Sequence, residues 1–266
     1  MHDNSCCPPK TNEDHIFLAH QVLFEQKAGR LSAPFGPDLL PGMYSPPVHT
    51  ILKPSSDKLH MVIDHSAGKY SLNSMINPKD IAGVKLDGIH SLGVSLRAFR
   101  VNDPHSDLVI FKSDVGAAYR QMPMHFLYQL LTVITVDNKH HVDRCNNFGN
   151  RGSQKIWQSF MSLVMWILVF KRGLKHLKCY TDDVFSFSAA GNLAYYSPYN
   201  RYMPSEQVAF LQLWDEIGLP HKNNKQILGP VIPCIGFDVD LNLMTVTMIA
   251  NFSSPPGDGP SGIFNG

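Results

Sequence analysis

A tight acidic turn between two short strand-like runs constrains the fold of this chain more than any other feature. Residues 177–180 and 184–187 are largely apolar and are joined through Thr181-Asp182-Asp183. Short apolar runs on either side of a turn predict the two strands of a hairpin. A third acid, Asp114, closes the apolar run at 108–111. Taken alone, an Asp-Asp pair predicts an ordinary hairpin turn, and a strand-terminal Asp predicts a cap or turn residue.

The rest of the chain mixes helical and strand periodicities in irregular order. Helices are predicted at 14–27, 80–97, 152–170 and 205–217. Further strands are predicted at 60–64, 129–136 with 140–144 across Asp137-Asn138, 231–238 and 244–248. Residues 32–47 and 66–77 read as connectors, and the Pro/Gly/Ser-rich residues 251–266 as disordered. Because the regular alternation of a doubly wound sheet is missing, the pattern predicts an α+β fold.

Charge and cysteine usage narrow the possible environments. The net charge is only +1, but residues 139–178 hold eight Lys or Arg against one acid. Such a stretch suits a polyanion, although a solvated positive face is equally compatible with it. The five cysteines include no Cys-x-x-Cys pair, and the N-terminus has no apolar signal region. The longest apolar run, at 160–170, is shorter than the ~20 residues of a membrane span. These features predict a reduced, intracellular protein, cytoplasmic or nuclear.

Three acids near strand ends suit phosphoryl transfer. That chemistry needs little covalent help from the protein and depends on charge neutralisation and in-line positioning. Two Mg²⁺ ions about 4 Å apart supply both, and hard Mg²⁺ prefers oxygen ligands. Carboxylates on adjacent strands of a rigid sheet are suitable ligands.

The residues around these acids form motifs that occur together in one known family. Phe111-Lys112-Ser113-Asp114, continuing through Tyr119 to Pro123, resembles the first palm motif of reverse transcriptases, and Asn147-Phe148-Gly149 through Ser153 resembles the second. Tyr180-Thr181-Asp182-Asp183 is similar to the Tyr-x-Asp-Asp box of that family. Three more segments complete a collinear set: Lys53-Pro54 with Met61 to Asp64 and Asn73, Gly218 to Lys222 with Lys225-Gln226, and Ile235 to Asp238. Asp64 to Gly68 and Ser71 to Ile76 resemble retroelement polymerases of fungal genomes.

The resemblance implies a palm built on an antiparallel sheet, with fingers and with the thumb largely absent. It divides the chain into an N-terminal helix and connector at 1–45, a fingers-like segment at 46–107, the palm at 108–250 and a tail at 251–266. The implied activity is RNA-directed DNA synthesis with two Mg²⁺ ions, or Mn²⁺ in their place. The implied partners are an RNA or DNA template with its primer and deoxynucleoside triphosphates, with no membrane.

The resemblance also assigns roles to individual residues. Asp114 and Asp182 would ligate both metals, with Asp183 and the Val115 carbonyl completing the metal set. Tyr119 would lie beneath the incoming sugar, and Gly149 would let the backbone approach the nucleotide. The basic residues would act as follows: Lys53 on the triphosphate, Lys225 as proton donor to the leaving pyrophosphate, and Arg151 and Lys155 on backbone phosphates.

The chain departs from the family pattern at two positions. His60 stands where the fingers strand usually carries Arg, and Gln154 stands where the second palm motif usually has Pro. A neutral imidazole cannot replace bidentate guanidinium contact with a phosphate. The sequence after Met248 leaves no room for a full thumb, as in a truncated frame. Three alternatives stay open: a non-catalytic nucleic-acid-binding remnant, a metal-dependent nuclease, and a structural or partner-binding globule.

Overall fold

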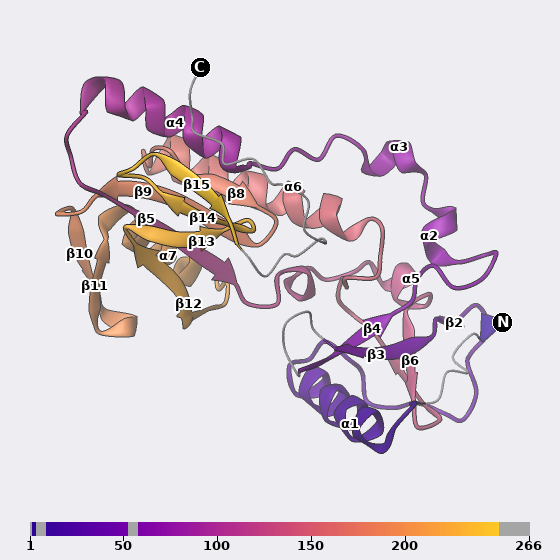
Figure 1. Ribbon diagram of the computed structural model, residues 1–266. Helices are drawn as coiled ribbons and strands as arrows, with labels where there is room; N and C mark the ends of the chain where they lie inside the picture. The colour runs from indigo at the N-terminus through magenta and orange to yellow at the C-terminus, as the bar shows by residue number, and fades with distance from the viewer. Residues whose placement is uncertain (1, 4–8, 53–57, 250–266) are drawn as a thin grey trace. The chain divides into compact units, whose positions relative to one another are not determined.

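The computed structural model describes residues 2–3, 9–52 and 58–249, and these fall into two compact units (Figure 1). The first unit comprises the described residues of Met1–Val84 together with Ala117–Trp157. The second comprises Lys85–Gly116 and the described residues from Gln158 onward. Lys53 and residues 251–266, for which the sequence predicts a triphosphate contact and a disordered tail, lie outside the described residues.

The first unit combines one long helix with short strand pairs. Helix α1 (Asn12–Lys27) begins with a capping box between Thr11 and Asp14. Strands β3 (Val48–Leu52) and β4 (Leu59–Ile63) pair antiparallel, as do β6 (Val133–Val136) and β7 (Lys139–Val142), whereas β1 (His2–Asp3) and β2 (Tyr44–Ser45) pair in parallel. Short helices fill the connections: α2 (Leu72–Met75), α3 (Pro78–Ile81), η1 (Ala118–Gln121) and α5 (Phe126–Gln129). Apolar side chains of α1, β3, β4 and β6 form its core.

The second unit is built on a four-stranded antiparallel sheet in the order β12-β5-β9-β8. Its strands are β5 (Leu108–Val115), β8 (Lys178–Tyr180), β9 (Asp183–Ala189) and β12 (His221–Gly229). Beside it lie the three-stranded antiparallel sheet of β13 (Val231–Cys234), β14 (Phe237–Asp240) and β15 (Thr245–Met248), and the hairpin of β10 (Leu193–Tyr196) and β11 (Arg201–Pro204). Helices α4 (Ile89–Asn102) and α7 (Ser205–Glu216) complete it, with most of α6 (Ser153–Trp166), the π-helical turn η2 (Ile167–Lys171) and the short η3 (Ser197–Tyr199).

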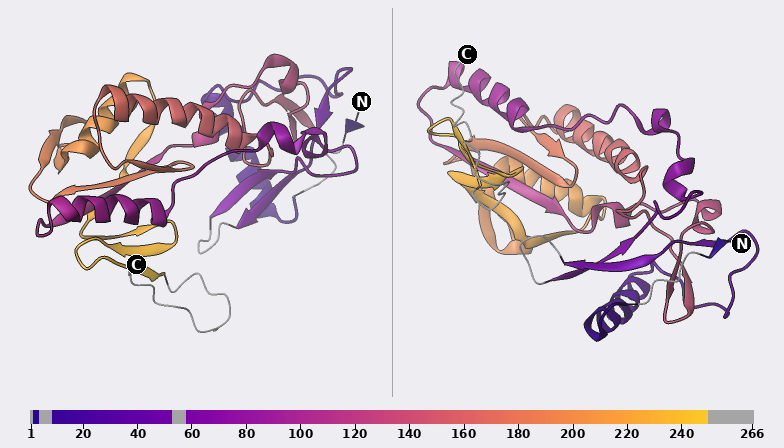
Figure 2. Two further views of the ribbon diagram at one scale, coloured as in Figure 1. Left: turned by 90° about the horizontal axis from the view of Figure 1, so that it is seen from above. Right: turned by 45° about the vertical axis from the view of Figure 1, so that its right-hand side comes forward.

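The two faces of β5 are packed by different elements. Side chains alternate along a strand, so Leu108 and Ile110 share one face with Lys112 and Asp114. The apolar end of that face packs with Phe185 and with residues of α4 and the β13–β15 sheet, which Figures 1 and 2 show lying beside it. On the opposite face, the ring of Phe111 stacks on Phe210 of α7 at 6.1 Å between ring centroids. On β5 itself the apolar side chains of this face end at Ile110, and Lys112 and Asp114 follow.

Several predicted elements are confirmed and others need correction. The helices at α1 and α7 and the strands on either side of Asp182 form where predicted. The single helix predicted at 80–97 is wrong, because α3 ends at Ile81 and α4 begins at Ile89. Gly83 adopts φ +78° and Gly88 is the extended cap of α4, and glycine favours such breaks over helix.

Two predicted strands also differ from the structure. The strand predicted at 129–136 begins only at Val133, after α5. The strand predicted at 231–238 is split into β13 and β14 by a turn at Ile235 and Gly236, both with positive φ. Six strands were not predicted from the sequence, namely β1, β2, β3, β10, β11 and β12. The mixture of helices and antiparallel sheets agrees with the predicted α+β class.

Two further observations concern the helices and the cysteines. Across residues 2–3, 9–52 and 58–249, none of the helices has the length and apolar character needed to cross a membrane. The three cysteines in this part of the chain, Cys145, Cys179 and Cys234, are free thiols.

Candidate active site

Strand pairing brings the three acids to one end of the four-stranded sheet. Asp114 on β5 is the register partner of Asp183 on β9, and Tyr180 of β8 pairs with the same Asp183 across the turn. The backbone N–H of Val115 donates to the carbonyl of Asp182 at 3.1 Å. The hairpin therefore lies directly beside the strand that carries Asp114, as its sequence neighbours led us to expect.

The turn that carries Asp182 holds a strained residue. Thr181 has φ +55°, a left-handed conformation that is unusual for a β-branched side chain. Such conformations cost roughly 1–3 kcal/mol and persist only where the surroundings impose them. Here the pairing of Tyr180 with Asp183 leaves just two residues to close the turn. The backbone conformation at Thr181 thus fixes where Asp182 leaves the sheet.

Two lysines neutralise part of the acidic cluster. The Nζ of Lys225 lies 3.2 Å from Oδ2 of Asp114, and the Nζ of Lys112 lies 3.2 Å from Oδ2 of Asp183. Lys225 belongs to β12, in the segment between His221 and Gln226 where the register with β5 shifts. Lys112 lies on β5 itself, two residues before Asp114.

The acids that remain close to one another resist ionisation. Burial raises the pKa of Asp182, and the negative charges of Asp183 and Asp114 raise it further. Burial also raises the pKa of Asp183, although the ammonium of Lys112 opposes that shift. Mutual repulsion of this kind is the electrostatic state that a bound cation relieves.

The carboxylates of the cluster suit a hard divalent cation, but in this structure two of them are paired with lysines instead. Carboxylate oxygens are the ligands that Mg²⁺ and Mn²⁺ prefer. Within the ranges that the structure describes, no group of three or more His, Cys, Asp or Glu side chains is placed to hold a metal ion. A cation at this cluster would therefore have to displace at least Lys225, the more exposed of the two lysines at 49% against 17%.

A close backbone approach fixes β12 next to the acidic end of β5. The N–H of Gly116 donates to the carbonyl of Pro220 at 2.7 Å. A Cβ at Gly116 would lie 3.2 Å from that carbonyl oxygen. Glycine at this position lets the segment that leads to Lys225 lie against the end of β5.

The first unit contains the other described candidate residues, and Tyr119 is the most enclosed of them. Tyr119 is 8% exposed, and its hydroxyl donates to Oε1 of Gln154. Its ring centroid lies 4.6 Å from that of Phe148. Gln154, where the resembled motif usually has Pro, therefore holds the phenol of Tyr119.

Gly149 has a packing reason to be glycine that the sequence did not reveal. A Cβ at this position would lie 2.0 Å from the carbonyl oxygen of Ile63 and 2.9 Å from the ring of His65. Asn73 secures the same loop, because its amide donates to the Gly149 carbonyl at 2.9 Å and accepts from the N–H of Arg151 at 2.8 Å. The roles in nucleotide approach and phosphate contact predicted for Gly149 and Arg151 stay predictions.

The remaining basic residues make varied contacts. Lys155 donates from Nζ to the carbonyl of Ala82 at 3.2 Å. Arg172 pairs with Glu216, and the Nζ of Lys171 lies 5.3 Å from the ring centroid of Trp166. The stretch 139–178 is divided between the two units. The basic stretch seen in the sequence is therefore partly used in intramolecular contacts.

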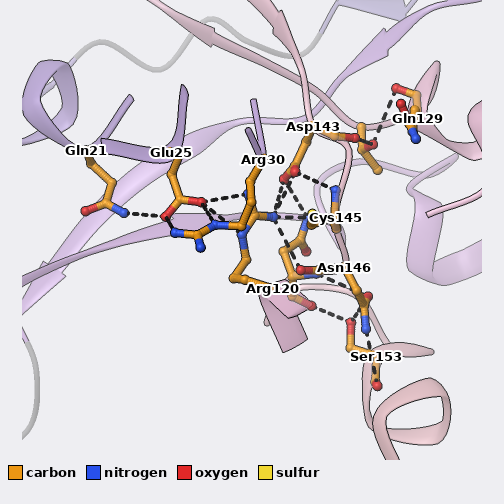
Figure 3. A network of polar contacts seen from close by, with 11 residues as sticks. Gln21, Glu25, Arg30, Arg120, Gln129, Asp143, Cys145, Asn146 and Ser153 are labelled. Carbon is orange, nitrogen blue, oxygen red and sulfur yellow. Dashed lines mark hydrogen bonds and ion pairs between the residues drawn. The ribbon is translucent and has the colours of Figure 1, made fainter. Parts of the chain in front are cut away.

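The sequence analysis did not single out two charged residues that make ion pairs in the structure. Lys112 stands inside the first motif at an i, i+2 spacing from Asp114, and the alternation of strand side chains was the signal that could have placed it on the same face. Arg120 follows Tyr119 and is buried with Asp143 and Glu25 in the network of Figure 3. No local pattern indicated that network, since Glu25 lies far away in the sequence.

Comparison with known proteins supports the fold. No protein-family model matches the chain, and no curated protein matches its sequence. Among solved structures, the chain is similar to the foamy viral protease-reverse transcriptase dRH in complex with ds DNA, with 15% identity and a TM-score of 0.65 over 96% of this chain and 41% of that one. It is also similar to the foamy viral protease-reverse transcriptase in complex with RNA/DNA hybrid, with 15% identity and a TM-score of 0.61 over 96% of this chain and 31% of that one. The chain thus has a reverse-transcriptase-like fold and spans less than half the length of either neighbour.

Proposed function

We propose that this chain catalyses template-directed nucleotidyl transfer, namely RNA-directed DNA synthesis in which a primer 3′-hydroxyl attacks the α-phosphate of a deoxynucleoside triphosphate. One observation carries the proposal: Asp114 and Asp183 are register partners at one end of an antiparallel sheet within a reverse-transcriptase-like fold. The neighbouring structures are complexes with ds DNA and with RNA/DNA hybrid, which supports a template and primer as partners of this chain.

The acidic cluster provides the cation site of the proposed reaction. Asp114 and Asp182 would hold two Mg²⁺ ions, or Mn²⁺, with the Val115 carbonyl as a further ligand and Asp183 in support. When bound, the cations activate the attacking hydroxyl and neutralise charge on the phosphates. Lys225, whose ammonium lies 3.2 Å from Asp114, is placed to give a proton to the leaving pyrophosphate.

The four-stranded sheet of the second unit belongs to the palm in this proposal, and the roles of the other candidate residues rest on their sequence motifs. Tyr119 lies beneath the incoming sugar and disfavours a 2′-hydroxyl. The loop at Gly149 approaches the nucleotide, and Arg151 and Lys155 contact backbone phosphates of the template or primer. Lys53, assigned to the triphosphate, belongs to the proposal from its sequence motif alone.

Primer extension on a homopolymeric RNA template, with deoxynucleotide and Mg²⁺ or Mn²⁺, tests the proposal. Extended product is expected from the wild-type chain and none from Asp182→Asn. The matched control is Asp38→Asn, which removes an exposed carboxylate outside the motifs and leaves extension unchanged. Absence of product from a folded wild-type chain, or equal product from Asp182→Asn, contradicts the proposal.

The lysine pairs favour one second candidate, a nucleic-acid-binding protein without turnover. Lys112 and Lys225 pair with two of the three acids, and a cation at Asp114 must compete with Lys225. In that case the wild-type chain would retain a labelled primer–template in a filter-binding assay but would not extend it with either cation. Binding and extension measured on one preparation separate the two functions.

A further inference from the structure

Lys112 and Lys225 differ in how firmly each is attached to the acidic cluster. The side chain of Lys112 is 17% exposed and that of its partner Asp183 is 20% exposed. The side chain of Lys225 is 49% exposed and that of Asp114 is 24% exposed. Exposed ion pairs are worth little and exchange readily with solvent, whereas a charge that is mostly covered by protein loses more stability when its partner leaves. The two lysines therefore cannot respond to an arriving cation in the same way.

The position of Lys112 in the sheet explains its attachment. Lys112 lies opposite Phe185 of β9 on one side and Ile227 of β12 on the other, so it belongs to a central strand. It shares its face of β5 with Leu108 and Ile110, which are fully covered in the core. Its stem is thus held between neighbouring strands, and its ammonium can reach the carboxylates only at the polar end of that face.

Lys225 has the freedom that Lys112 lacks. It lies in β12 where the register with β5 shifts between His221 and Gln226. A side chain that is half exposed can leave Asp114 and be solvated without leaving a buried charge behind. An approaching cation can consequently replace Lys225 at Asp114, while the pair of Lys112 with Asp183 stays closed.

We propose that Lys112 is a positioning residue that holds Asp183 out of the cation-binding set, so that Asp114 and Asp182 are the side chains that take divalent cations when Lys225 withdraws. This inference rests on the proposed function and refines it. Lys112 offsets one of the three negative charges at the sheet end and fixes Asp183 opposite Asp114. Asp183 then contributes to the site through its backbone pairing with Asp114 and its ion pair with Lys112. The carboxylate of Asp182 is left to bind a cation.

Mn²⁺ binding, measured by the loss of the free-ion signal in electron paramagnetic resonance, tests this assignment without requiring activity. Because the Lys112–Asp183 pair is neutral and supplies no ligand, the double variant Lys112→Met/Asp183→Asn is expected to bind Mn²⁺ within about threefold of the wild-type affinity. Lys112→Met alone is expected to bind more tightly, since it removes a positive charge and frees a carboxylate. Asp182→Asn is expected to weaken binding by at least about tenfold.

The contrary outcomes are distinct. A double variant that binds at least about tenfold more weakly than wild type makes Asp183 a ligand and overturns the inference while leaving the cation site intact. A wild-type chain that binds no Mn²⁺ overturns both the inference and the proposed function. If Lys112→Met/Asp183→Asn does not fold by circular dichroism, Lys112→Gln/Asp183→Asn replaces it, because the two amides can hydrogen-bond in place of the ion pair and the same affinity is expected.

Discussion

The Glu25–Arg120–Asp143 network of the first unit and the Asp114–Asp182–Asp183 cluster of the second unit both bury charged groups, but they balance charge in opposite ways. In the network, the guanidinium of Arg120 lies between two carboxylates, 2.7 Å from Asp143 and 3.0 Å from Glu25 (Figure 3). Arg30 adds a second cation on Glu25 at 2.7 Å. In the cluster, three carboxylates gather at one sheet end.

The pKa directions show the same contrast. Burial alone would raise the pKa of Glu25, but the guanidinium groups of Arg30 and Arg120 lower it below its usual value. The pKa of Asp182 rises, because burial and the charges of Asp183 and Asp114 act together. The network therefore favours the charged state of Glu25, whereas burial raises the pKa of Asp143 although the charge of Arg120 opposes that shift. In the cluster, the pKa values of both Asp182 and Asp183 are raised. A site that opposes its own charge is a candidate for binding a cation.

The largest effect is expected from breaking the network at its centre. Arg120→Met leaves Asp143 and Glu25 buried without their shared cation, which typically costs about 3–5 kcal/mol. It also removes the donor to the carbonyls of Cys145 and Asn146. Urea unfolding followed by circular dichroism measures the loss. Arg144→Met, at an exposed arginine, is the control and should change stability by less than about 0.5 kcal/mol. Equally small losses of stability in both variants would show that the network does not stabilise the fold.

The pH dependence of stability tests a third buried group, the imidazole of His65 in the first unit. Unlike the carboxylates, this group is uncharged in its usual buried state and needs no cation beside it. Burial lowers the pKa of His65 to about 4 from 6.5. Because the folded-state pKa lies below the unfolded one, the contribution is fully present above pH 6.5 and is lost as the pH falls from 6.5 through about 4. The loss on this group is about 3 kcal/mol.

The measurement compares the unfolding free energy of wild type and His65→Asn across that range. The variant is expected to show a shallower decline, whatever its stability at neutral pH. Identical slopes in the two proteins would show that His65 is not excluded from solvent.

Gly149→Ala should destabilise the first unit by about 1–3 kcal/mol through overpacking. The added Cβ would lie 2.0 Å from the carbonyl oxygen of Ile63, so the loop must shift. Thermal unfolding gives the magnitude. Gly191→Ala is the control, because a Cβ there would meet no atom within 4 Å. A Gly149→Ala chain as stable as the control would mean that the loop can move away freely.

The smallest expected effect has the opposite sign and lies in the cluster. Asp182→Asn removes a carboxylate whose pKa is raised by burial and by Asp183 and Asp114. Because the ionised form is disfavoured in the folded state, ionisation of Asp182 lowers the stability of the fold. This loss is absent below the usual pKa of an aspartate and grows as the pH rises above that pKa. At pH 7 and without divalent cations, the Tm should rise by about 2–4 °C. Asp238→Asn should leave the Tm unchanged, and a lower Tm for Asp182→Asn would contradict the assignment of repulsion.

Short-range patterns in the sequence predicted the parts of the site that depend on local structure. The apolar runs on either side of Asp182 and the run before Asp114 predicted strands, and the structure pairs them. The helix predicted at 80–97 failed because apolar spacing continued across Gly83 and Gly88, where the backbone breaks. The spacing of apolar residues does not indicate such breaks unless the low helix propensity of glycine is also taken into account.

Contacts between distant segments could not be predicted from one sequence. Arg120 pairs with Glu25, which lies 95 residues earlier in the chain. The carbonyl that leaves no room for a side chain at Gly149 belongs to Ile63, which is also distant in sequence. Only the folded chain shows that Lys112 pairs with Asp183. The sequence therefore predicted the three acids as candidates, and the structure was needed to identify the lysines that pair with two of them.

Thermal unfolding with and without Mn²⁺ tests most directly the claim that the cluster's repulsion serves cation binding. A ligand that binds only the folded state stabilises it by about 2.7 kcal/mol at a hundredfold excess over its Kd. Mn²⁺ is expected to raise the Tm of the wild-type chain and to raise that of Asp182→Asn by at most about half as much at the same concentration, because this variant binds the cation at least about tenfold more weakly. A wild-type Tm that does not respond to Mn²⁺, or an equal rise in both proteins, would contradict the claim.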